Sequence, residues 1–371
     1  MTRPRVVLLR GHSANPWELG AWELLRDRFD VVVGVTGRNL FDGSGLELER
    51  AEARTLRDRL PRGRLGDLAV HLPGDRYLGL ERVLEGADVV HSAELGWWFS
   101  TGPAELKERL GFRLVLTVWE TIPHLDRFLD PVRARRVRAG KQVSLDAADL
   151  FLATTDRARR ALLLEGAADE RIVVAPPGID TARFASGRAE RPARHLIVSP
   201  GRIVWEKGHF DVLRALASLG GDHRLLIVGA GKERERLLAE AAALGVADRV
   251  EIRAVPYEAM PDVYASASAV VLASLTLPIW EEQFGMVLAE ALAAGTSVVA
   301  AASGAIPEVL AGTGATLVEP GDWVGLARAL AEGALARPPA ERVAYDPELV
   351  RRYSLEAAAE RLASAYERAL A

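Results

Sequence analysis

The hydrophobic positions form short runs of aliphatic and β-branched residues, which alternate with longer segments rich in alanine, leucine, arginine and glutamate. These runs are apolar throughout, as is typical of parallel strands that are buried on both faces of a sheet. In the first half, the expected strands are Arg5–Leu9, Val31–Val35, Asp88–His91, Leu114–Val118, Leu150–Ala153 and Ile172–Ala175. In the second half, they are Leu196–Ser199, Leu225–Val228, Val250–Arg253, Val270–Ala273, Ser297–Ala300 and Thr316–Val318. The longer segments predict helices, among them Ala21–Phe29 and Val132–Ala148.

Two series of about six strands predict an α/β fold with two Rossmann-like, doubly wound domains that face a cleft. The stretch Pro176–Arg194 concentrates proline, glycine, aspartate and arginine without helical or strand periodicity, which predicts a linker. The domains are therefore expected at residues 1–185 and 186–350, followed by a C-terminal segment at 351–371. Within that segment, Ser354–Ala371 begins with a capping serine and predicts a helix.

Composition narrows the class of protein further. The 371 residues include no cysteine, which excludes disulfides, cysteine-bound zinc and iron–sulfur clusters. The 47 basic and 51 acidic side chains leave a net charge of −4, so we expect no nucleic-acid partner. Apolar runs fall short of the roughly 20 residues that cross a bilayer, and VVLL is too short for a signal peptide. We therefore expect a soluble, cytoplasmic protein.

The most informative segment is Pro278–Leu310, in which Glu282 and Glu290 stand with seven residues between them. A helix that began at Phe284 would carry Glu290 about 10 Å beyond its start and leave Glu282 in the preceding loop. The first amides of such a helix belong to Phe284, Gly285 and Met286. Free amides and the helix dipole suit a phosphate, and carboxylates suit sugar and ribose hydroxyls. The spacing thus fits a nucleotide sugar, although an isolated pair of glutamates is more often ordinary helix surface.

A second candidate element, Pro200–Leu213, directly follows the first expected strand of the second half. It contains Gly201, Arg202 and Lys207, and lysine occurs at only three other positions of the chain. A forked guanidinium and a compact ammonium are a suitable pair for a diphosphate leaving group. The alternative is a solvated basic loop.

The second half resembles the retaining GT-B glycosyltransferases of glycosyltransferase family 4. The segments that carry this resemblance are GRIVWEKG, LLIVGAGKERERL, RAVPYEAMPDVYASASAVVLAS, the E-x(7)-E of EEQFGMVLAEALAAG, GAIPEVL and the linker PPGIDTARF. They occur in the family's order over Ala175–Asp322. The resemblance implies a GT-B fold whose C-terminal helix crosses back to the first domain.

The resemblance also implies roles for individual residues. Arg202 and Lys207 would hold the diphosphate, Glu282 the hydroxyls of the donor sugar, and Glu290 the ribose. The further donor-binding candidates are Gly11, Gly201, Arg253, Val255, Gln283, Phe284, Gly285 and Met286. Among all of these, Glu282, Lys207 and Arg202 are the expected catalytic residues, together with His124 of the first domain.

Two competing nucleotide motifs are incomplete. Gly229–Ala230–Gly231 follows a strand, but Arg234 stands where a dinucleotide fingerprint has its third glycine. The chain also has no P-loop, G-x(4)-G-K-[S/T]. Because the sequence shows no D-x-D pair and supplies two cations and a helix dipole, we expect neither a metal nor another cofactor.

Acceptor-side candidates come from the first domain. His12, His91 and His124 follow expected strands, so the strand-end rule predicts that each faces the cleft, although a lone histidine is as often structural. The first loop, with Ser13 and Asn15, is small and polar, and so fits a substrate near the phosphate. Trp17, Trp97 and Trp98 are candidates for an aromatic wall or for core packing. The run Arg133, Arg135, Arg136 and Arg138 suits anionic lipid or a solvated helix face.

The first domain departs from the family at one motif. Many members carry a histidine at the third position of a T-x-H segment, where this chain has Thr117–Val118–Trp119. Either His124 or Glu120 takes over that polar contact, or the contact is absent.

The sequence as a whole predicts a retaining, metal-independent glycosyltransferase that moves a sugar from a nucleotide diphosphate-sugar, UDP- or GDP-linked, to an acceptor hydroxyl. The acceptor would be a sugar, a lipid-linked molecule or a small molecule, with weak peripheral membrane contact. The alternatives are a GT-B epimerase or phosphorylase, and a non-catalytic nucleotide-sugar-binding protein. The donor sugar, base, acceptor and oligomeric state stay open.

Overall fold

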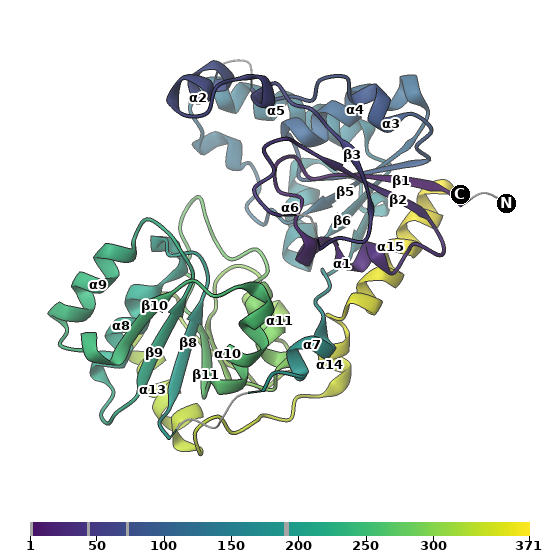
Figure 1. Ribbon diagram of the computed structural model, residues 1–371. Helices are drawn as coiled ribbons and strands as arrows, with labels where there is room; N and C mark the ends of the chain where they lie inside the picture. The colour runs from purple at the N-terminus through teal and green to yellow at the C-terminus, as the bar shows by residue number, and fades with distance from the viewer. Residues whose placement is uncertain (1–2, 43–44, 72–73, 189–192) are drawn as a thin grey trace. The chain divides into compact units, whose positions relative to one another are not determined.

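The chain forms two compact α/β units, each built on one parallel sheet (Figure 1). A computed structural model describes residues 3–42, 45–71, 74–188 and 193–371. One unit comprises Met1–Ile179 together with Leu355–Ala371, and the other comprises Asp180–Ser354. Across these described ranges, no helix has both the length and the apolar character needed to span a bilayer.

The first unit contains a seven-stranded sheet with the order β3-β2-β1-β4-β5-β6-β7. Its strands are β1 (Arg5–Leu9), β2 (Asp30–Val35), β3 (Glu49–Glu52), β4 (Val89–Ala93), β5 (Arg113–Val118), β6 (Leu150–Ala153) and β7 (Ile172–Val174). Its helices are α1 (Pro16–Glu23), α2 (Arg64–His71), α3 (Leu80–Leu84), α4 (Trp98–Leu110), α5 (Pro131–Ala147), α6 (Asp156–Glu165) and α15 (Leu355–Leu370). The strand order reverses between β1 and β4, the position where doubly wound sheets bind ligands.

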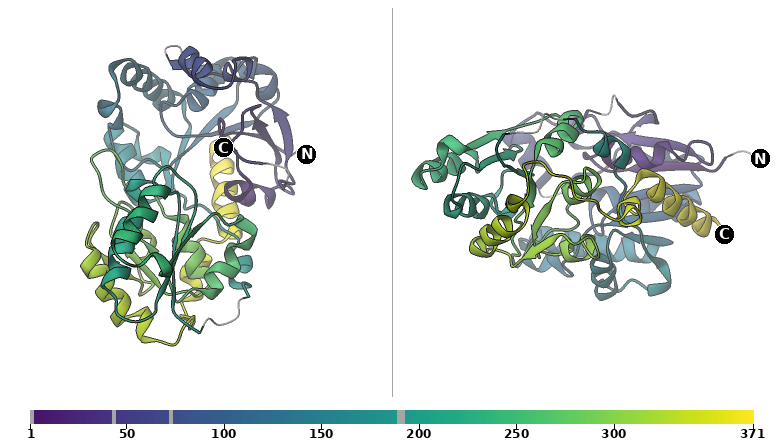
Figure 2. Two further views of the ribbon diagram at one scale, coloured as in Figure 1. Left: turned by 60° about the vertical axis from the view of Figure 1, so that its left-hand side comes forward. Right: turned by 90° about the horizontal axis from the view of Figure 1, so that it is seen from below.

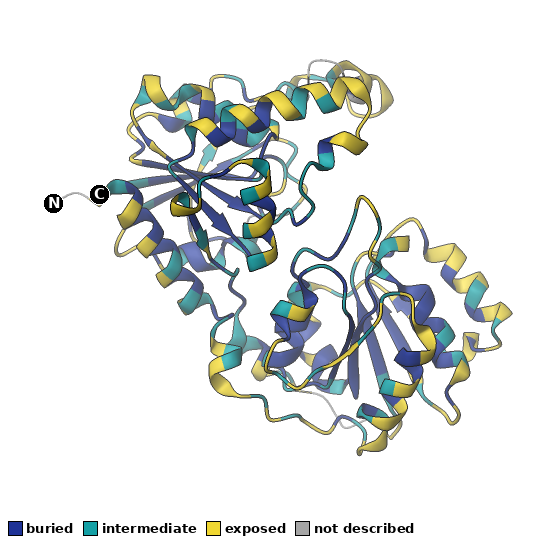
Figure 3. Cartoon of the chain, turned by 180° about the vertical axis from the view of Figure 1, so that it is seen from behind, coloured by how far each residue is buried: buried dark blue, intermediate teal, exposed yellow. Residues whose placement is uncertain are grey.

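Both faces of this sheet are covered. Successive side chains of a strand point to opposite faces, so Val6 and Leu8 pack in a core with α1 and α15. Val7 and Leu9 pack in a second core with α3, α4, α5 and α6. Figure 3 shows the result as dark strands beneath helices that are exposed on their outer sides. Burial on both faces explains why the strands read as continuous apolar runs.

The C-terminal helix α15 lies against α1 and the first sheet, as the family resemblance implies (Figure 2). A chain of buried hydrogen bonds joins it to the sheet. Nε1 of Trp22 donates to the hydroxyl of Tyr366 at 2.6 Å, and that hydroxyl lies 2.6 Å from Nδ1 of His91. Nε2 of the same imidazole lies 2.7 Å from Oγ1 of Thr117, so the ring links the helix to two strands of the sheet.

The second unit contains a six-stranded sheet with the order β10-β9-β8-β11-β12-β13. Its strands are β8 (Leu196–Pro200), β9 (Arg224–Val228), β10 (Val250–Arg253), β11 (Ala269–Leu272), β12 (Val298–Ala301) and β13 (Thr316–Val318). Its helices are α7 (Thr181–Ala185), α8 (His209–Ser218), α9 (Arg234–Ala243), α10 (Met260–Ser266), α11 (Met286–Ala293), α12 (Ile306–Val309), α13 (Trp323–Glu332) and α14 (Pro347–Arg351). The reversal of strand order falls between β8 and β11.

All twelve predicted strands are present, with ends within two residues of the expected ones. The polar edge strand β3 was missed because its residues, ERAE, show no apolar run. The helix expected at Ala21–Phe29 is wrong in position. Asn15 accepts a hydrogen bond from the amide of Glu18 and so starts α1 earlier, and residues 24–28 form turns.

The predicted linker was expected to contain neither helix nor strand, but it contains a short helix, α7. Asp180 caps this helix by accepting from the amide of Arg183. Residues 189–192 of that stretch lie outside the described residues. Along the chain, the boundaries between the two units lie at Ile179/Asp180 and Ser354/Leu355, whereas the limits predicted from the sequence are residues 185 and 350.

Candidate functional site

The basic loop lies between β8 and α8, at the reversal of strand order in the second sheet. The side chain of Arg202 is exposed, whereas that of Lys207 is 14% exposed and points toward Glu282. Gly208 ends the loop with φ of 70°, and a Cβ there would lie 1.8 Å from the carbonyl oxygen of Ala273. The loop therefore packs against the chain after β11 so closely that only glycine fits.

The two glycines of the incomplete dinucleotide motif support this basic loop. A Cβ on Gly229 would lie 1.9 Å from the oxygen of Gly201, and one on Gly231 would lie 2.1 Å from the oxygen of Ile203. The amide of Ile203 also donates to the carbonyl of Ala230 at 2.9 Å. The loops that follow β8 and β9 thus pack backbone against backbone. This close packing accounts for both glycines, so a dinucleotide site is not needed to explain them.

Lys207 and Glu282, expected to be catalytic, form a contact in the second unit. Nζ of Lys207 donates to Oε2 of Glu282 at 2.6 Å, and the hydroxyl of Ser274 donates to the same oxygen at 2.6 Å. The ring of Trp280 lies 5.4 Å from Nζ. Because β8 and β11 are neighbours, residues 75 positions apart along the chain meet at one sheet edge. The carboxylate of Glu282 is buried, and it is held by a cation and a hydroxyl.

Helix α11 begins two residues later than expected. Gly285 adopts φ of 83° and caps the helix, so the first helical residue is Met286. Glu290 therefore lies about one turn into the helix, rather than two. Phe284 lies outside the helix, with its buried ring 5.5 Å from that of Tyr353. Gln283, between Glu282 and this turn, is half-buried.

Glu290 is buried, and two tyrosines donate to its carboxylate. The hydroxyl of Tyr264 lies 2.7 Å from Oε2, and that of Tyr257 lies 3.2 Å from Oε1. Burial raises the pKa of Glu290, and the two phenols act in the opposite direction. Arg183 lies over the ring of Tyr257, 4.6 Å from its centroid. Neither tyrosine was predicted from the sequence as a site residue, although the two stand seven residues apart in a segment that carries the family resemblance.

Arg253 and Val255 lie at the carboxyl end of β10, beside these loops. The carbonyl of Arg253 accepts from the amide of Gly229 at 3.0 Å, and its guanidinium contacts Glu251 at 2.8 Å. Val255 is half-buried in the following turn. The expected donor residues of the second unit thus lie on the loops that follow β8 and β11, at and just after the end of β10, and in α11, whereas Gly11 belongs to the first unit.

The first loop of the first unit follows β1, at the other reversal of strand order. The amide of Gly11 donates to the hydroxyl of Tyr77 at 3.2 Å. His12 is held at both nitrogens, 2.8 Å from Oγ1 of Thr36 and 2.7 Å from Oδ2 of Asp75. Ser13 is exposed, and Asn15 caps α1. This loop is fixed by its neighbours while it keeps an exposed hydroxyl.

The expectation for His91 is wrong. The residue lies inside β4 rather than after it, and its side chain is 0% exposed. Burial lowers its pKa well below the ordinary value, so the ring is neutral and serves the hydrogen-bond chain to Tyr366 and Thr117. The apolar run before His91 signalled the strand but gave no information on where the strand ends.

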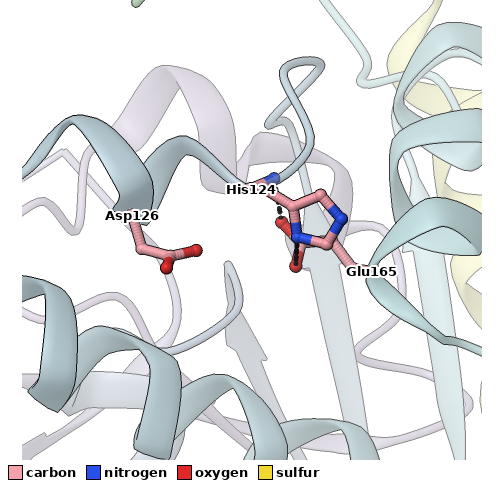
Figure 4. A group of neighbouring side chains, drawn as sticks. All are labelled: His124, Asp126 and Glu165. Carbon is pink, nitrogen blue, oxygen red and sulfur yellow. Dashed lines mark hydrogen bonds and ion pairs between the residues drawn. The ribbon is translucent and has the colours of Figure 1, made fainter.

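His124 has a backbone φ of 57° and contacts Glu165 twice, through its amide at 2.6 Å and through Nδ1 at 3.4 Å (Figure 4). Asp126 lies close to both, and ligand atoms of the three residues come within 4.8 Å of one another. The ammonium of Lys141 already contacts Asp126, at 3.0 Å, and Glu165. A lysine thus balances the charge that a cation would otherwise neutralise.

Glu120 and Trp119 lie in the strand-end loop of β5. Oε1 of Glu120 accepts from the amides of Thr121, at 3.0 Å, and Ile122, at 2.8 Å. The amide of Trp119 donates to Oε1 of Glu94 at 2.9 Å. The departure from T-x-H therefore coincides with a loop whose backbone is fixed by two glutamate side chains.

The tryptophans and arginines of the first unit have different environments. Trp98 contacts the rings of His12 and Tyr77, at centroid distances of 5.1 and 4.8 Å, whereas Trp97 is exposed. Trp17 lies edge-on to Phe41 at 5.6 Å. On α5, Arg133, Arg135 and Arg138 are all exposed, and Arg138 donates to the buried Asp126 at 3.0 Å. Packing thus accounts for part of the tryptophan set, and an ion pair for one of the arginines.

The chain has two doubly wound units, with a basic loop and a carboxylate pair at the strand-order reversal of the second. This fold is that of the GT-B glycosyltransferases, and similarity to known proteins supports the use of a nucleotide sugar. The chain belongs to glycosyltransferase family 4. Residues 21–183 match the model described as Glycosyltransferase Family 4, and residues 180–345 match Glycosyl transferases group 1.

Named relatives and solved structures agree with this assignment. D-inositol 3-phosphate glycosyltransferase of Mycobacterium ulcerans is 31% identical over 370 residues, covering 92% of this chain and 74% of the relative. That of Mycobacteroides abscessus is 32% identical over 368 residues, covering 92% and 77%. The fold resembles Anabaena HepE in complex with UDP and glucose, with a TM-score of 0.75 and 17% identity over 99% and 100% of the two chains. Sucrose-phosphate synthase from Thermosynechococcus elongatus has a TM-score of 0.75 and 20% identity over 99% of each chain.

Proposed function

We propose that this glycosyltransferase is a retaining, metal-independent enzyme that moves a sugar from a UDP- or GDP-linked donor to an acceptor hydroxyl. The observation that carries the proposal is the contact of Lys207 with Glu282 at 2.6 Å, beside the exposed Arg202. A cation and a carboxylate in contact can each exchange partners when a donor binds. The ammonium then contacts the diphosphate, and the carboxylate accepts from sugar hydroxyls.

The chemistry is the departure of a diphosphate. The bond between the anomeric carbon and the phosphate oxygen breaks, and a bond from the acceptor oxygen forms on the same face of the sugar. The acceptor proton passes to the departing diphosphate, so the step balances without a side-chain base. Arg202, Lys207 and the first amides of α11 stabilise the negative charge on the leaving group. Two cations and a helix N-terminus supply the positive charge that a metal provides elsewhere.

Glu290 completes the donor site by accepting from the ribose hydroxyls. Its carboxylate accepts from two phenols. The longer of these contacts, from Tyr257 at 3.2 Å, is the one that a ribose hydroxyl can replace. Tyr264 then stays to hold the carboxylate. The base lies against Arg253 and Val255.

The acceptor is proposed from the relatives and the first loop. The named relatives act on D-inositol 3-phosphate, which makes this polyol phosphate the first acceptor to test. Other sugars and lipid-linked molecules form the rest of the panel. Ser13 and His12 of the first loop, with Glu120 and His124, are the acceptor-side candidates. We place the enzyme in the cytoplasm, with Arg133 and Arg135 as its contact to anionic lipid.

A ligand screen followed by a turnover assay tests the function. Thermal-shift measurements with UDP, GDP, ADP and their sugars identify the base and the donor, because a ligand that binds the folded state raises Tm. Product NMR then reads the anomeric configuration, and the retaining mechanism predicts that it equals that of the donor. Unchanged rates in EDTA support metal independence, whereas a loss that magnesium restores contradicts it.

Controls separate the alternative functions. A phosphorylase requires orthophosphate, and an epimerase converts the nucleotide sugar without any acceptor. A carrier protein binds the donor but shows no turnover with any member of the acceptor panel. Any of these results overturns the proposed transfer.

A further inference from the structure

His209, the first residue of α8, joins three parts of the second unit. Its side chain is buried, and Nδ1 lies 2.8 Å from the hydroxyl oxygen of Ser199 in β8. Nε2 lies 3.1 Å from the carbonyl oxygen of Arg202 in the basic loop. The imidazole thus connects a strand, a helix and the loop between them.

The partners determine where the ring carries its hydrogen. A carbonyl oxygen can only accept, so Nε2 of His209 is the donor to Arg202. Nδ1 is then the acceptor, and the Ser199 hydroxyl donates to it. Burial lowers the pKa of His209 to about 4, so the ring is neutral at physiological pH and this one tautomer satisfies both contacts.

Backbone contacts hold the other polar groups at the start of the basic loop. The amide of Gly201 donates to the carbonyl of Val228 at 2.9 Å, and that of Ile203 donates to Ala230 at 2.9 Å. The carbonyl of Arg202, between them, accepts from the amide of Val204 at 3.0 Å and from Nε2 of His209 at 3.1 Å, so the imidazole is its side-chain partner. The peptide plane that carries this carbonyl sets the direction in which the exposed Arg202 side chain leaves the loop.

We propose that His209 is a positioning residue, whose Nε2–H holds the Arg202 peptide so that the guanidinium faces the donor diphosphate. The inference rests on the proposed function, because it presumes that Arg202 contacts a diphosphate. His209 touches neither substrate in this scheme and acts only through the loop. Its chemistry is that of a neutral hydrogen-bond donor.

Two variants, each with a side-chain amide that replaces one ring nitrogen, test the positioning role of His209. The amide nitrogen of glutamine can occupy the place of Nε2, whereas that of asparagine reaches only the place of Nδ1. We therefore expect His209→Gln to keep the UDP affinity and the donor KM within about threefold of the unaltered enzyme. His209→Asn loses the bond to Arg202 and should weaken UDP binding and raise the donor KM by about tenfold. Ser199→Ala, which spares Nε2, should behave as His209→Gln does.

Binding measurements separate this inference from the proposed function. Calorimetry with UDP and with uridine distinguishes diphosphate contacts from nucleoside contacts, and only the former should weaken in His209→Asn. Failure of the unaltered protein to bind either UDP or GDP contradicts the proposed function itself. Equal UDP affinities for the folded glutamine and asparagine variants, in an enzyme that does bind UDP, overturn the role of His209 alone.

A measurement on the unaltered chain keeps the test independent of variant folding. In protein labelled with ¹⁵N-histidine, the expected tautomer places a protected hydrogen on Nε2 of His209, and its signal should shift when UDP is added. A hydrogen on Nδ1, or a signal that UDP leaves unmoved, contradicts the inference.

Discussion

The hydroxyl of Tyr264 donates to Oε2 of Glu290 at 2.7 Å, and both side chains are buried. Tyr264 lies in α10 and Glu290 in α11, so the bond joins two helices of the second unit. Tyr257 adds a longer contact of 3.2 Å from the turn before α10. The carboxylate that the family resemblance assigns to the ribose is therefore oriented by two phenols.

Removal of the Tyr264 hydroxyl should destabilise the second unit. In Tyr264→Phe, a buried carboxylate loses its shorter hydrogen bond, and we expect a loss of about 1–3 kcal/mol in the free energy of unfolding. Tyr257→Phe should cost less, because its contact is longer and less buried. Urea denaturation measures both. Tyr345→Phe is the matched control, because its hydroxyl donates to the backbone of Thr296 at 2.9 Å and should affect stability without changing UDP affinity. A UDP affinity unchanged in Tyr264→Phe would contradict the role of Glu290.

Replacement of Lys207 should separate catalysis from folding. Lys207→Ala removes a cation from the proposed leaving-group site, and we expect turnover to fall by about 100-fold or more. Circular dichroism and Tm check that the fold persists. Arg214→Ala provides a control of the same charge change, because Arg214 pairs with Asp211 at 2.8 Å on α8, away from the basic loop. Near-normal turnover in folded Lys207→Ala would exclude this lysine from the site.

The close approach at Gly208 predicts a large effect from one methyl group. In Gly208→Ala, the new Cβ would meet the oxygen of Ala273, and the positive φ adds strain, so we expect a loss of about 3 kcal/mol or more. Gly111→Ala is the control. Gly111 has φ of 76° with open space around its Cβ position, so it tests the backbone strain alone, about 1–2 kcal/mol. Equal losses in the two variants, measured by denaturation, would show that the contact with Ala273 is relaxed at no cost.

Glu94 makes the stability of the first unit depend on pH. It follows β4 with φ of 61°, and burial raises the pKa of its carboxyl to about 8. The ordinary pKa of a glutamate is 4.5, so between these values the folded chain holds a proton that the unfolded chain has lost. The free energy of unfolding therefore falls as pH rises through this window. Glu94→Gln imitates the protonated form and should avoid that fall.

The test measures Tm of the unaltered chain and of Glu94→Gln at a series of pH values. We expect Glu94→Gln to match the unaltered chain near pH 5 and to exceed it by several degrees at pH 9. Glu81→Gln is the control. A hydrogen bond from its own backbone amide and a contact with Arg109 at 2.7 Å lower the pKa of this partly exposed carboxyl, so the Tm difference for Glu81→Gln should not change with pH above pH 5. If the Tm difference between Glu94→Gln and the unaltered chain is also independent of pH, Glu94 is not protonated at neutral pH.

Much of the fold was predictable because local patterns of apolar and polar residues mark its strands and helices. Parallel strands that are buried on both faces, such as β1 and β11, must be apolar throughout, and they stand out from the amphipathic segments. The polar strand β3 carries no such signal, since it lies at a sheet edge. The start of α11 was misplaced for another reason. The left-handed conformation of Gly285 delays the helix, and a glycine in a sequence permits that conformation without requiring it.

The sequence predicted many of the residues of the candidate site, but it did not predict which of them contact one another. Spacing and family resemblance singled out Lys207 and Glu282, yet neither indicated that the two side chains touch. His91 looked like an open strand-end residue and is part of the core, because the true end of β4 lies two residues further on. Tyr264 lies in a segment that carries the family resemblance, and His209 directly follows another, but neither was assigned a role from the sequence. Their roles follow only from the atoms they contact.

The sequence by itself determined two doubly wound units, the boundary region between them, and a basic loop with a carboxylate pair suited to a nucleotide sugar. Those properties depend on burial and on spacing along the chain, which residue order records directly. Tertiary structure alone decided which groups meet: Lys207 with Glu282, Tyr264 with Glu290, and His209 with Arg202. Such bonds form or fail over a fraction of an ångström, and that distance is set by how strands and helices pack rather than by any short stretch of sequence.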